Sequence, residues 1–197
     1  MHYMKIGIII FLLNIFFAIV GFQFTSDSYK QVGNDKQFYA TVQKHRQIYS
    51  MSCIPSSVEM VLKYNKKVSP DYFQLQEVWK DKADGSFQNF DGKTIKGLTF
   101  TCCFREPRNR NFPINSLYKV IEDELKAGRK IIISLPSGPD FWHIYVLDHK
   151  TEDGEFVAYS RGYNDNNVLE IRKVKELIKA INGTDILTYK LSDVDKE

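Results

Sequence analysis

A cysteine follows a glutamine by six positions and stands at the start of a predicted helix. The stretch QIYSMSCIPSSVEMVLKY places Gln47 at its first position and Cys53 at its seventh. A helix N-terminus favours a thiolate through its dipole and free N–H groups, and a nearby imidazolium favours it more strongly. When a thiolate attacks a carbonyl group, the resulting oxyanion needs hydrogen-bond donors, and a glutamine amide together with the Cys53 N–H could supply them. This combination predicts acyl transfer through a cysteine nucleophile.

Such a nucleophile needs a general base, and the sequence contains four histidines. His143 opens the apolar run HIYVLDH directly after the turn-forming segment GPDFW, so a strand start would hold it rigidly and leave its ring accessible. His2 lies in the N-terminal targeting region, His45 in a polar loop, and His149 at the far end of the same run. We therefore expect Cys53 to be the nucleophile and His143 to be its base.

Hydrophobic periodicity predicts the elements that would position these residues. Val58, Val61 and Leu62 recur at helical spacing after Pro55, which suits a first helical turn. The expected helices are 54–64, a segment starting at Ser69, 114–127 and 174–181, and the expected strands are 131–135, 143–149, 155–160 and 186–191. Glycines and prolines indicate loops over 81–113, and 24–40 is expected to be irregular. Helices followed by an antiparallel sheet indicate the α+β class.

The composition fits one globular domain and argues against nucleic-acid binding. The 197 residues are 43% hydrophobic, and a net charge of +3 with interleaved lysines and acids leaves no basic block. Three cysteines do not make a disulfide scaffold, and the adjacent pair Cys102 and Cys103 lacks metal-ligand spacing, so we expect neither a metal site nor a cofactor. A bridge from Cys53 to either of them is the alternative to a free thiol.

The N-terminal sequence predicts a targeting signal. Lys5 precedes the apolar run 6–20, which matches the positive and apolar regions of a secretory signal peptide covering residues 1–23. The alternative is an uncleaved anchor over 6–22, slightly shorter than the ~20 residues that a spanning helix needs. Either interpretation predicts an exported protein, periplasmic or extracellular, with a membrane contact only if the segment is retained. Beyond it we expect a lead-in over 24–42, one domain over 43–191 and a polar tail over 192–197.

The spacing Gln47-x5-Cys53 before a helix with a Met-Val-Leu run, and a distant His143 opening an apolar strand, resemble the papain-like cysteine peptidases. The nearest branch is the bacteriocin leader (double-glycine) peptidases and their exported single-domain relatives, and the resemblance spans roughly 43–191. It implies a papain-like α+β fold, with N-terminal helices carrying the cysteine packed on an antiparallel sheet carrying the histidine. It also implies a secreted bacterial thiol protease that hydrolyses a peptide or protein substrate through an acyl-enzyme. In this family the upstream glutamine helps form the oxyanion hole, and an Asp or Asn on the next strand orients the histidine.

Two positions differ from the family pattern. Ile54 replaces the usual glycine and narrows the space beside the nucleophile, and Ser160 falls where the Asp or Asn is expected. Asn164 and Asp165 are alternative partners for His143.

These differences leave other functions open. The fold could be catalytically inactive and act as a binding module, or the chain could be an acyl or peptidyl transferase, as in the phytochelatin-synthase-like proteins. A structural envelope protein held by the apolar segment is a third alternative.

Overall fold

The computed structural model describes residues 36–80, 86–137 and 141–192. The strands are β1 (Thr94–Ile95), β2 (Leu98–Cys103), β3 (Ile131–Pro136), β4 (Trp142–Lys150), β5 (Phe156–Arg161), β6 (Val168–Ile171) and β7 (Ile186–Leu191). The helices are α1 (Lys36–Lys44), α2 (Cys53–Tyr64), α3 (Gln74–Trp79), α4 (Ile114–Lys126) and α5 (Val174–Ala180), with a 3-10 helix η1 (Phe87–Asn89). The strands form an antiparallel sheet in the order β1-β2-β7-β3-β4-β5-β6.

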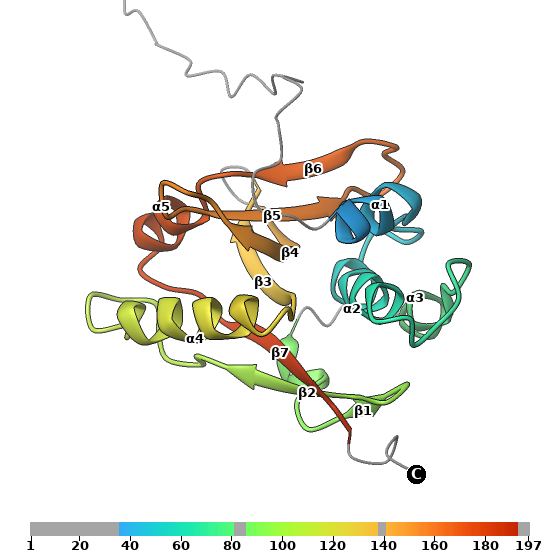
Figure 1. The fold of residues 1–197 in the computed structure, drawn as a ribbon, viewed down its shortest axis with the longest axis horizontal. Helices are drawn as coiled ribbons and strands as arrows, with labels where there is room; N and C mark the ends of the chain where they lie inside the picture. Colours follow the sequence, from blue (N-terminus) through green and yellow to red (C-terminus); the bar gives the residue numbers. More distant parts are fainter. Residues whose placement is uncertain (1–35, 81–85, 138–140, 193–197) are drawn as a thin grey trace, which may run out of the picture. The chain divides into compact units, whose positions relative to one another are not determined.

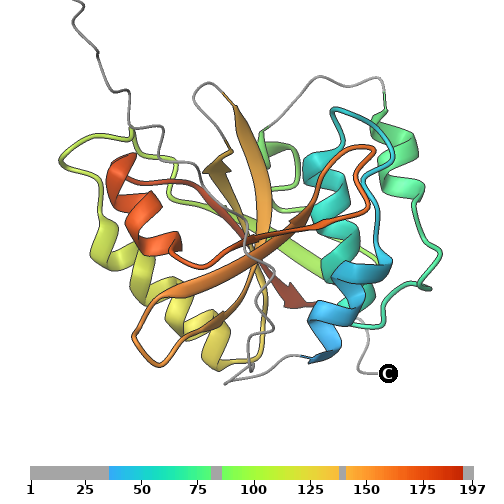
Figure 2. The same cartoon turned by 90° about the horizontal axis from the view of Figure 1, so that it is seen from above.

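Helices cover both faces of this sheet, with α1, α2 and α3 on one side and α4 and α5 on the other (Figure 1, Figure 2). Side chains alternate between the two faces along a strand. In β4, Ile144 and Val146 pack with α2, whereas Tyr145 and Leu147 pack with α4 and α5. Burial on both faces explains why the central strands are continuous apolar runs, a pattern more common in parallel sheets.

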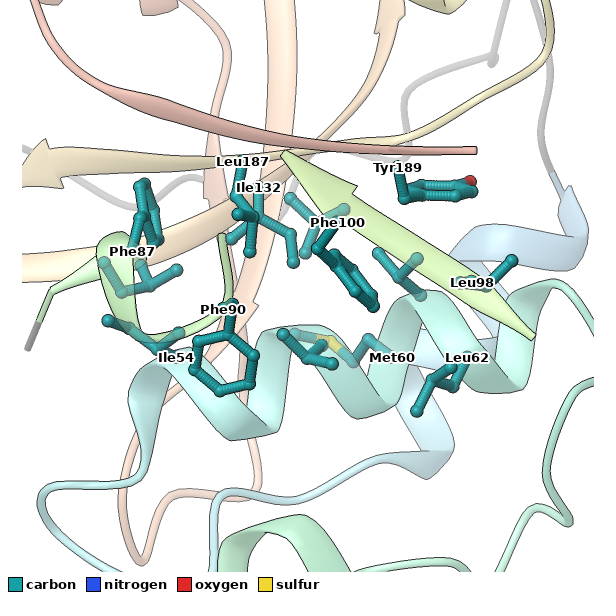
Figure 3. Packing of buried hydrophobic residues seen from close by; sticks show 14 of the residues in the cluster. Ile54, Met60, Leu62, Phe87, Phe90, Leu98, Phe100, Ile132, Leu187 and Tyr189 are labelled. Atoms are coloured by element: carbon teal, nitrogen blue, oxygen red, sulfur yellow. The ribbon is translucent and has the colours of Figure 1, made fainter. Parts of the chain in front are cut away.

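Helix α2 is buried along most of its length, which fixes the position of its first residue. All residues from Ile54 to Leu62 are buried. Figure 3 shows side chains of α2 in one cluster with side chains from η1 and from the sheet, among them Phe87, Phe100, Ile132 and Leu187. Each fully buried large apolar side chain stabilises the fold by about 1.5–3 kcal/mol. Any shift of α2, and therefore of Cys53, would lose several such contacts.

Most elements match the sequence-based prediction. The helices expected at 54–64, 114–127 and 174–181 correspond to α2, α4 and α5. The strands expected at 131–135, 143–149, 155–160 and 186–191 correspond to β3, β4, β5 and β7. The α+β class with an antiparallel sheet is confirmed. Three short strands were missed: β1 and β2 lie inside the segment expected to be loops, and β6 was not expected. β2 pairs with β7, which is distant in sequence, and β6 pairs with the neighbouring strand β5.

The expectation of an irregular lead-in up to position 40 was wrong for its last part. Helix α1 begins at Lys36, and its Phe38 and Val42 are fully buried in the core on the α2 side. This part of the lead-in therefore belongs to the folded domain. The expected signal peptide or anchor over 1–23 and the end of the polar tail lie outside the described residues. Within the described ranges, no helix has the length and apolar character needed to cross a bilayer.

The helix expected from Ser69 is shorter than predicted and begins at Gln74. The N–H groups of Leu75 and Gln76 donate to one oxygen of the buried Glu59 carboxylate, at 2.9 and 3.2 Å. The first N–H groups of a helix have no partner within the helix, so an acceptor at this point fixes where the helix starts. The start of α3 is therefore determined by a side chain of α2.

Candidate active site

Cys53 lies at the start of α2, as expected, and is its first residue, but its environment does not favour the thiolate. The thiol is half-buried and free. Burial raises the pKa of the Cys53 thiol, and the N–H groups of Ile54 and of Cys53 itself oppose this shift without cancelling it. The direction is the opposite of the one expected from the helix start alone. In the free protein the neutral thiol is therefore favoured.

His143 is held by Ser160, one of the three partners that the sequence left open. The Nε2 atom of His143 lies 2.8 Å from Ser160 Oγ, and that hydroxyl donates its single proton to the Ile144 carbonyl at 2.6 Å. Ser160 Oγ must then accept from His143, which places the ring proton on Nε2. The neutral tautomer so defined has its basic lone pair on Nδ1, the atom a general base would use. A hydroxyl therefore takes the position of the Asp or Asn side chain expected from the resemblance.

The protonated form of His143 receives little support from its surroundings. Burial lowers the pKa of this histidine, and the backbone of Arg161 opposes the shift. Ser160 is 2% exposed and carries no charge that could stabilise an imidazolium. The ring also packs edge-on against Tyr145, with centroids 5.3 Å apart. In the free protein this environment favours a neutral imidazole.

Cys53 and His143 lie on contacting elements but are not hydrogen-bonded to each other. Helix α2 packs against β4, and Cys53 contacts the cluster that includes Ile144, the residue after His143. The His143 ring lies beside Tyr145, which belongs to the opposite face of the sheet. Among the described residues no hydrogen bond joins the thiol to the imidazole. Proton transfer between them therefore requires a closer approach than the free protein shows.

Gln47 stabilises the loop before the nucleophile. It forms an isolated parallel bridge with Tyr163, and its Nε2 donates to the carbonyls of Tyr49 and Ser50 at 2.9 and 3.0 Å. Both amide hydrogens are thus used, so in this conformation none is left for an oxyanion. The Oε1 atom is buried without a hydrogen-bond partner in the described structure. A role in an oxyanion hole would require the amide to rotate, and it stays a prediction.

Asn164 and Asp165, the alternative partners of His143, lie elsewhere. Together with Asn166 they line a cavity of about 270 Å³ whose other wall is formed by residues 46–48. Neither Cys53 nor His143 lines this cavity. Asn164 adopts a positive φ of 56°, which suits a turn rather than a strand position facing the histidine. The structure therefore leaves Ser160 as the group that orients the ring.

The other cysteines take no part in the site. Cys102 and Cys103 are consecutive residues of β2, so their side chains point to opposite faces of the sheet. All three cysteines are free, so the bridge considered as an alternative for Cys53 is not formed. Among the described residues, no group of three or more His, Cys, Asp or Glu side chains could hold a metal ion.

Sequence reasoning missed a buried polar network behind the nucleophile. His45, expected in a polar loop, is 1% exposed, and its Nε2 lies 3.0 Å from Ser56 Oγ. Its ring stacks on Phe73 at 5.3 Å, and Glu59 and Gln76 complete the network. The one local signal was a glutamate inside the apolar run of α2, since a charged residue there must be paired when it is buried.

Comparison of the sequence with known protein families and with characterised proteins finds no significant match.

Proposed function

We propose that this chain is an exported cysteine peptidase with a papain-like fold, in which Cys53 is the nucleophile and His143 the general base. One observation carries the proposal. Ser160 fixes the His143 ring through Nε2 and leaves Nδ1 as the basic atom, on the strand that packs against the helix begun by Cys53. A base whose tautomer is set by a second group is the arrangement that thiol-dependent acyl transfer needs.

In the proposed reaction, Cys53 and His143 act together in two steps, acylation of the cysteine and hydrolysis of the thioester. The Cys53 sulfur forms a bond to the peptide carbonyl carbon while the thiol proton passes to His143 Nδ1. The backbone N–H groups at the start of α2 would face the oxyanion, since Ser52 makes no side-chain cap to them. His143 then gives the proton to the leaving amine as the C–N bond breaks. Water, activated by the same base, hydrolyses the thioester and frees the cysteine.

Exposed apolar side chains flank the proposed site in sequence and favour a peptide substrate with apolar residues. Met51 lies two residues before Cys53, and Phe141 and Trp142 directly precede His143; all three are about half exposed or more. The guanidinium of Arg108 lies 4.1 Å from the centroid of the Trp142 ring and holds this side chain in place. Large exposed apolar groups commonly mark contact surfaces for ligands or partners.

A binding module without catalysis is the second candidate, and one observation favours it. Burial raises the pKa of the Cys53 thiol and lowers that of His143, so neither group is held in its charged form. Papain-like activity through a resting thiolate–imidazolium pair would need both shifts reversed. The proposed peptidase instead forms its nucleophile by proton transfer to His143 as the thiol attacks an electrophile, which requires no resting ion pair.

The test is the modification rate of Cys53 by iodoacetamide, followed by peptide mass spectrometry in the full chain and in a His143→Ala variant. General-base assistance is typically worth about 10²–10⁴-fold, so we expect the variant to react at least tenfold more slowly near neutral pH. Cys103, half-buried in the same chain, is the internal reference. Equal Cys53 rates in the two proteins would refute the peptidase and favour the binding module. A positive result justifies a peptide-library screen with Cys53→Ala as the inactive control.

A further inference from the structure

The side chain of Gln76 on α3 fills every hydrogen-bonding position it has. Its Nε2 donates to the Arg46 carbonyl at 2.9 Å and to Glu59 Oε2 at 2.7 Å. Its Oε1 accepts from the Ile48 N–H and from the Ser52 hydroxyl, both at 2.8 Å. A primary amide has two donors and two acceptor positions, so this residue, fully buried, is fully satisfied.

The contacts allow only one orientation of this amide. Rotation by half a turn would place its NH2 group against the Ile48 N–H and its oxygen against the Arg46 carbonyl and the Glu59 carboxylate. Each of these would be a donor–donor or acceptor–acceptor pair in a buried site, where unpaired polar groups are costly. Gln76 is therefore a rigid connector between three points of the chain that precedes Cys53.

Glu59 anchors this connector to the nucleophile helix. Its Oε2 accepts from Gln76 Nε2, and its Oε1 accepts from the N–H groups of Leu75 and Gln76 at the start of α3. Glu59 is 0% exposed and lies on α2, the helix that begins with Cys53. Burial raises the pKa of the Glu59 carboxyl group, and the hydrogen bonds from Gln76 and Leu75 oppose this shift without cancelling it. Glu59 and Gln76 together therefore fix the position of the 46–52 segment relative to α2.

The segment held in this way contains the groups proposed for the chemistry. Arg46 and Ile48 flank Gln47, and Ser52 directly precedes Cys53. The single proton of the Ser52 hydroxyl is shared between two acceptors, the Tyr49 carbonyl and Gln76 Oε1, and the hydroxyl makes no capping bond to α2. A serine at this position normally accepts from a first-turn N–H group. Gln76 therefore helps keep the helix start uncapped and open to an anion.

We propose that Gln76, locked by Glu59, is a positioning residue that holds the nucleophile segment in register with α2 and keeps the N-terminus of α2 free for the oxyanion. This inference rests on the proposed function and adds a residue that touches neither substrate nor the reacting atoms. It acts through Ser52 and through the backbone on either side of Gln47.

The experiment measures whether Cys53 still depends on His143 once the connector is removed. The full chain is prepared with and without His143→Ala, in wild-type, Gln76→Met and Ser52→Ala backgrounds. Iodoacetamide is the probe, Cys53 modification is followed by mass spectrometry, and Cys103 is the reference. We expect His143→Ala to slow the modification of Cys53 at least tenfold in the wild-type background, following the usual size of general-base effects. In the Gln76→Met background we expect it to slow this modification less than threefold. Gln74→Met, on the exposed side of α3, is the matched control and should leave the tenfold dependence intact.

The outcomes separate the two proposals. No dependence on His143 in the wild-type background contradicts the proposed function, and with it the positioning role. A tenfold dependence that persists in Gln76→Met refutes the positioning role while the peptidase stands. If Gln76→Met does not fold, Ser52→Ala keeps the test decisive, because this substitution removes only one hydroxyl. A His143 dependence of the Cys53 rate that is reduced at least twofold in Ser52→Ala supports the positioning role. An unchanged dependence overturns it. Circular dichroism below the unfolding transition confirms that the compared variants are folded.

Discussion

Replacing Ser160 with aspartate tests whether this hydroxyl sets the protonation of His143. Ser160 Oγ accepts the Nε2–H at 2.8 Å without carrying a charge, and burial lowers the pKa of the histidine. A carboxylate within ~4–6 Å typically raises the pKa of a histidine by about 1–3 units, and one unit corresponds to about 1.4 kcal/mol. Position 160 is 2% exposed, so the cost of burying the carboxylate reduces the rise in the pKa of His143. We expect Ser160→Asp to raise the pKa of His143 by roughly 1–2 units.

The assay is an NMR titration of the histidine Cε1–H resonances. Ser160→Asn has the shape of the aspartate without its charge, and we expect it to change the pKa of His143 by less than about half a unit. An unchanged His143 titration in Ser160→Asp, or the same rise in Ser160→Asn, would show that the hydroxyl contact does not control this histidine.

The same substitution should reverse the contribution of His143 to the pH dependence of folding. In the wild type the folded-state pKa lies below the unfolded value of 6.5, so the histidine costs stability as the pH falls below that value. In Ser160→Asp a folded-state pKa above 6.5 would contribute stability that is fully present below 6.5 and lost as the pH rises through the folded-state pKa. Urea unfolding at about pH 5.5 and about pH 8 gives the sign of the change in the free energy of unfolding for the wild type and for Ser160→Asp. Parallel pH dependences in the two proteins would contradict this account.

The remaining predictions concern folding stability. Gly183→Ala should destabilise by about 3 kcal/mol, because its φ of +112° is strained for any side chain and a Cβ would lie 2.3 Å from the Phe112 ring. Gly92→Ala, with φ +69° and open space, should cost only about 1–2 kcal/mol in the same urea titration, and equal costs would contradict the clash. His45 is held neutral mainly by burial, with its pKa well below 6.5, so the wild type should lose about 1 kcal/mol between about pH 6.5 and 5.5. His45→Gln should remove that loss, and its persistence would assign it to other groups. Lys130→Met should cost about 3–5 kcal/mol in thermal or urea unfolding, because it leaves the buried Asp148 carboxylate without its cation; a loss below about 1 kcal/mol would show that the pair contributes little.

The sequence by itself determined the elements that carry the candidate site. The helix from Cys53 to Tyr64 follows from apolar spacing and a proline in its first turn, and β4 follows from an apolar run after a turn-forming segment. Gln47, Cys53 and His143 stand out because their residue types and local positions suit one reaction. These are local signals, in which backbone preference and side-chain periodicity act over a few residues. They predicted the α+β class and the antiparallel sheet for the same reason.

Only the tertiary structure decided which residues meet and in which protonation state. Ser160 meets His143 across a strand pair, and Gln76 reaches the backbone of Arg46, thirty residues away in sequence. No short-range pattern encodes these contacts, because they depend on strand register and on how α3 packs beside α2. Burial also reversed the direction expected for the pKa of Cys53. The free energy of a charge depends on all the groups that exclude water from it, and those groups come from the whole fold.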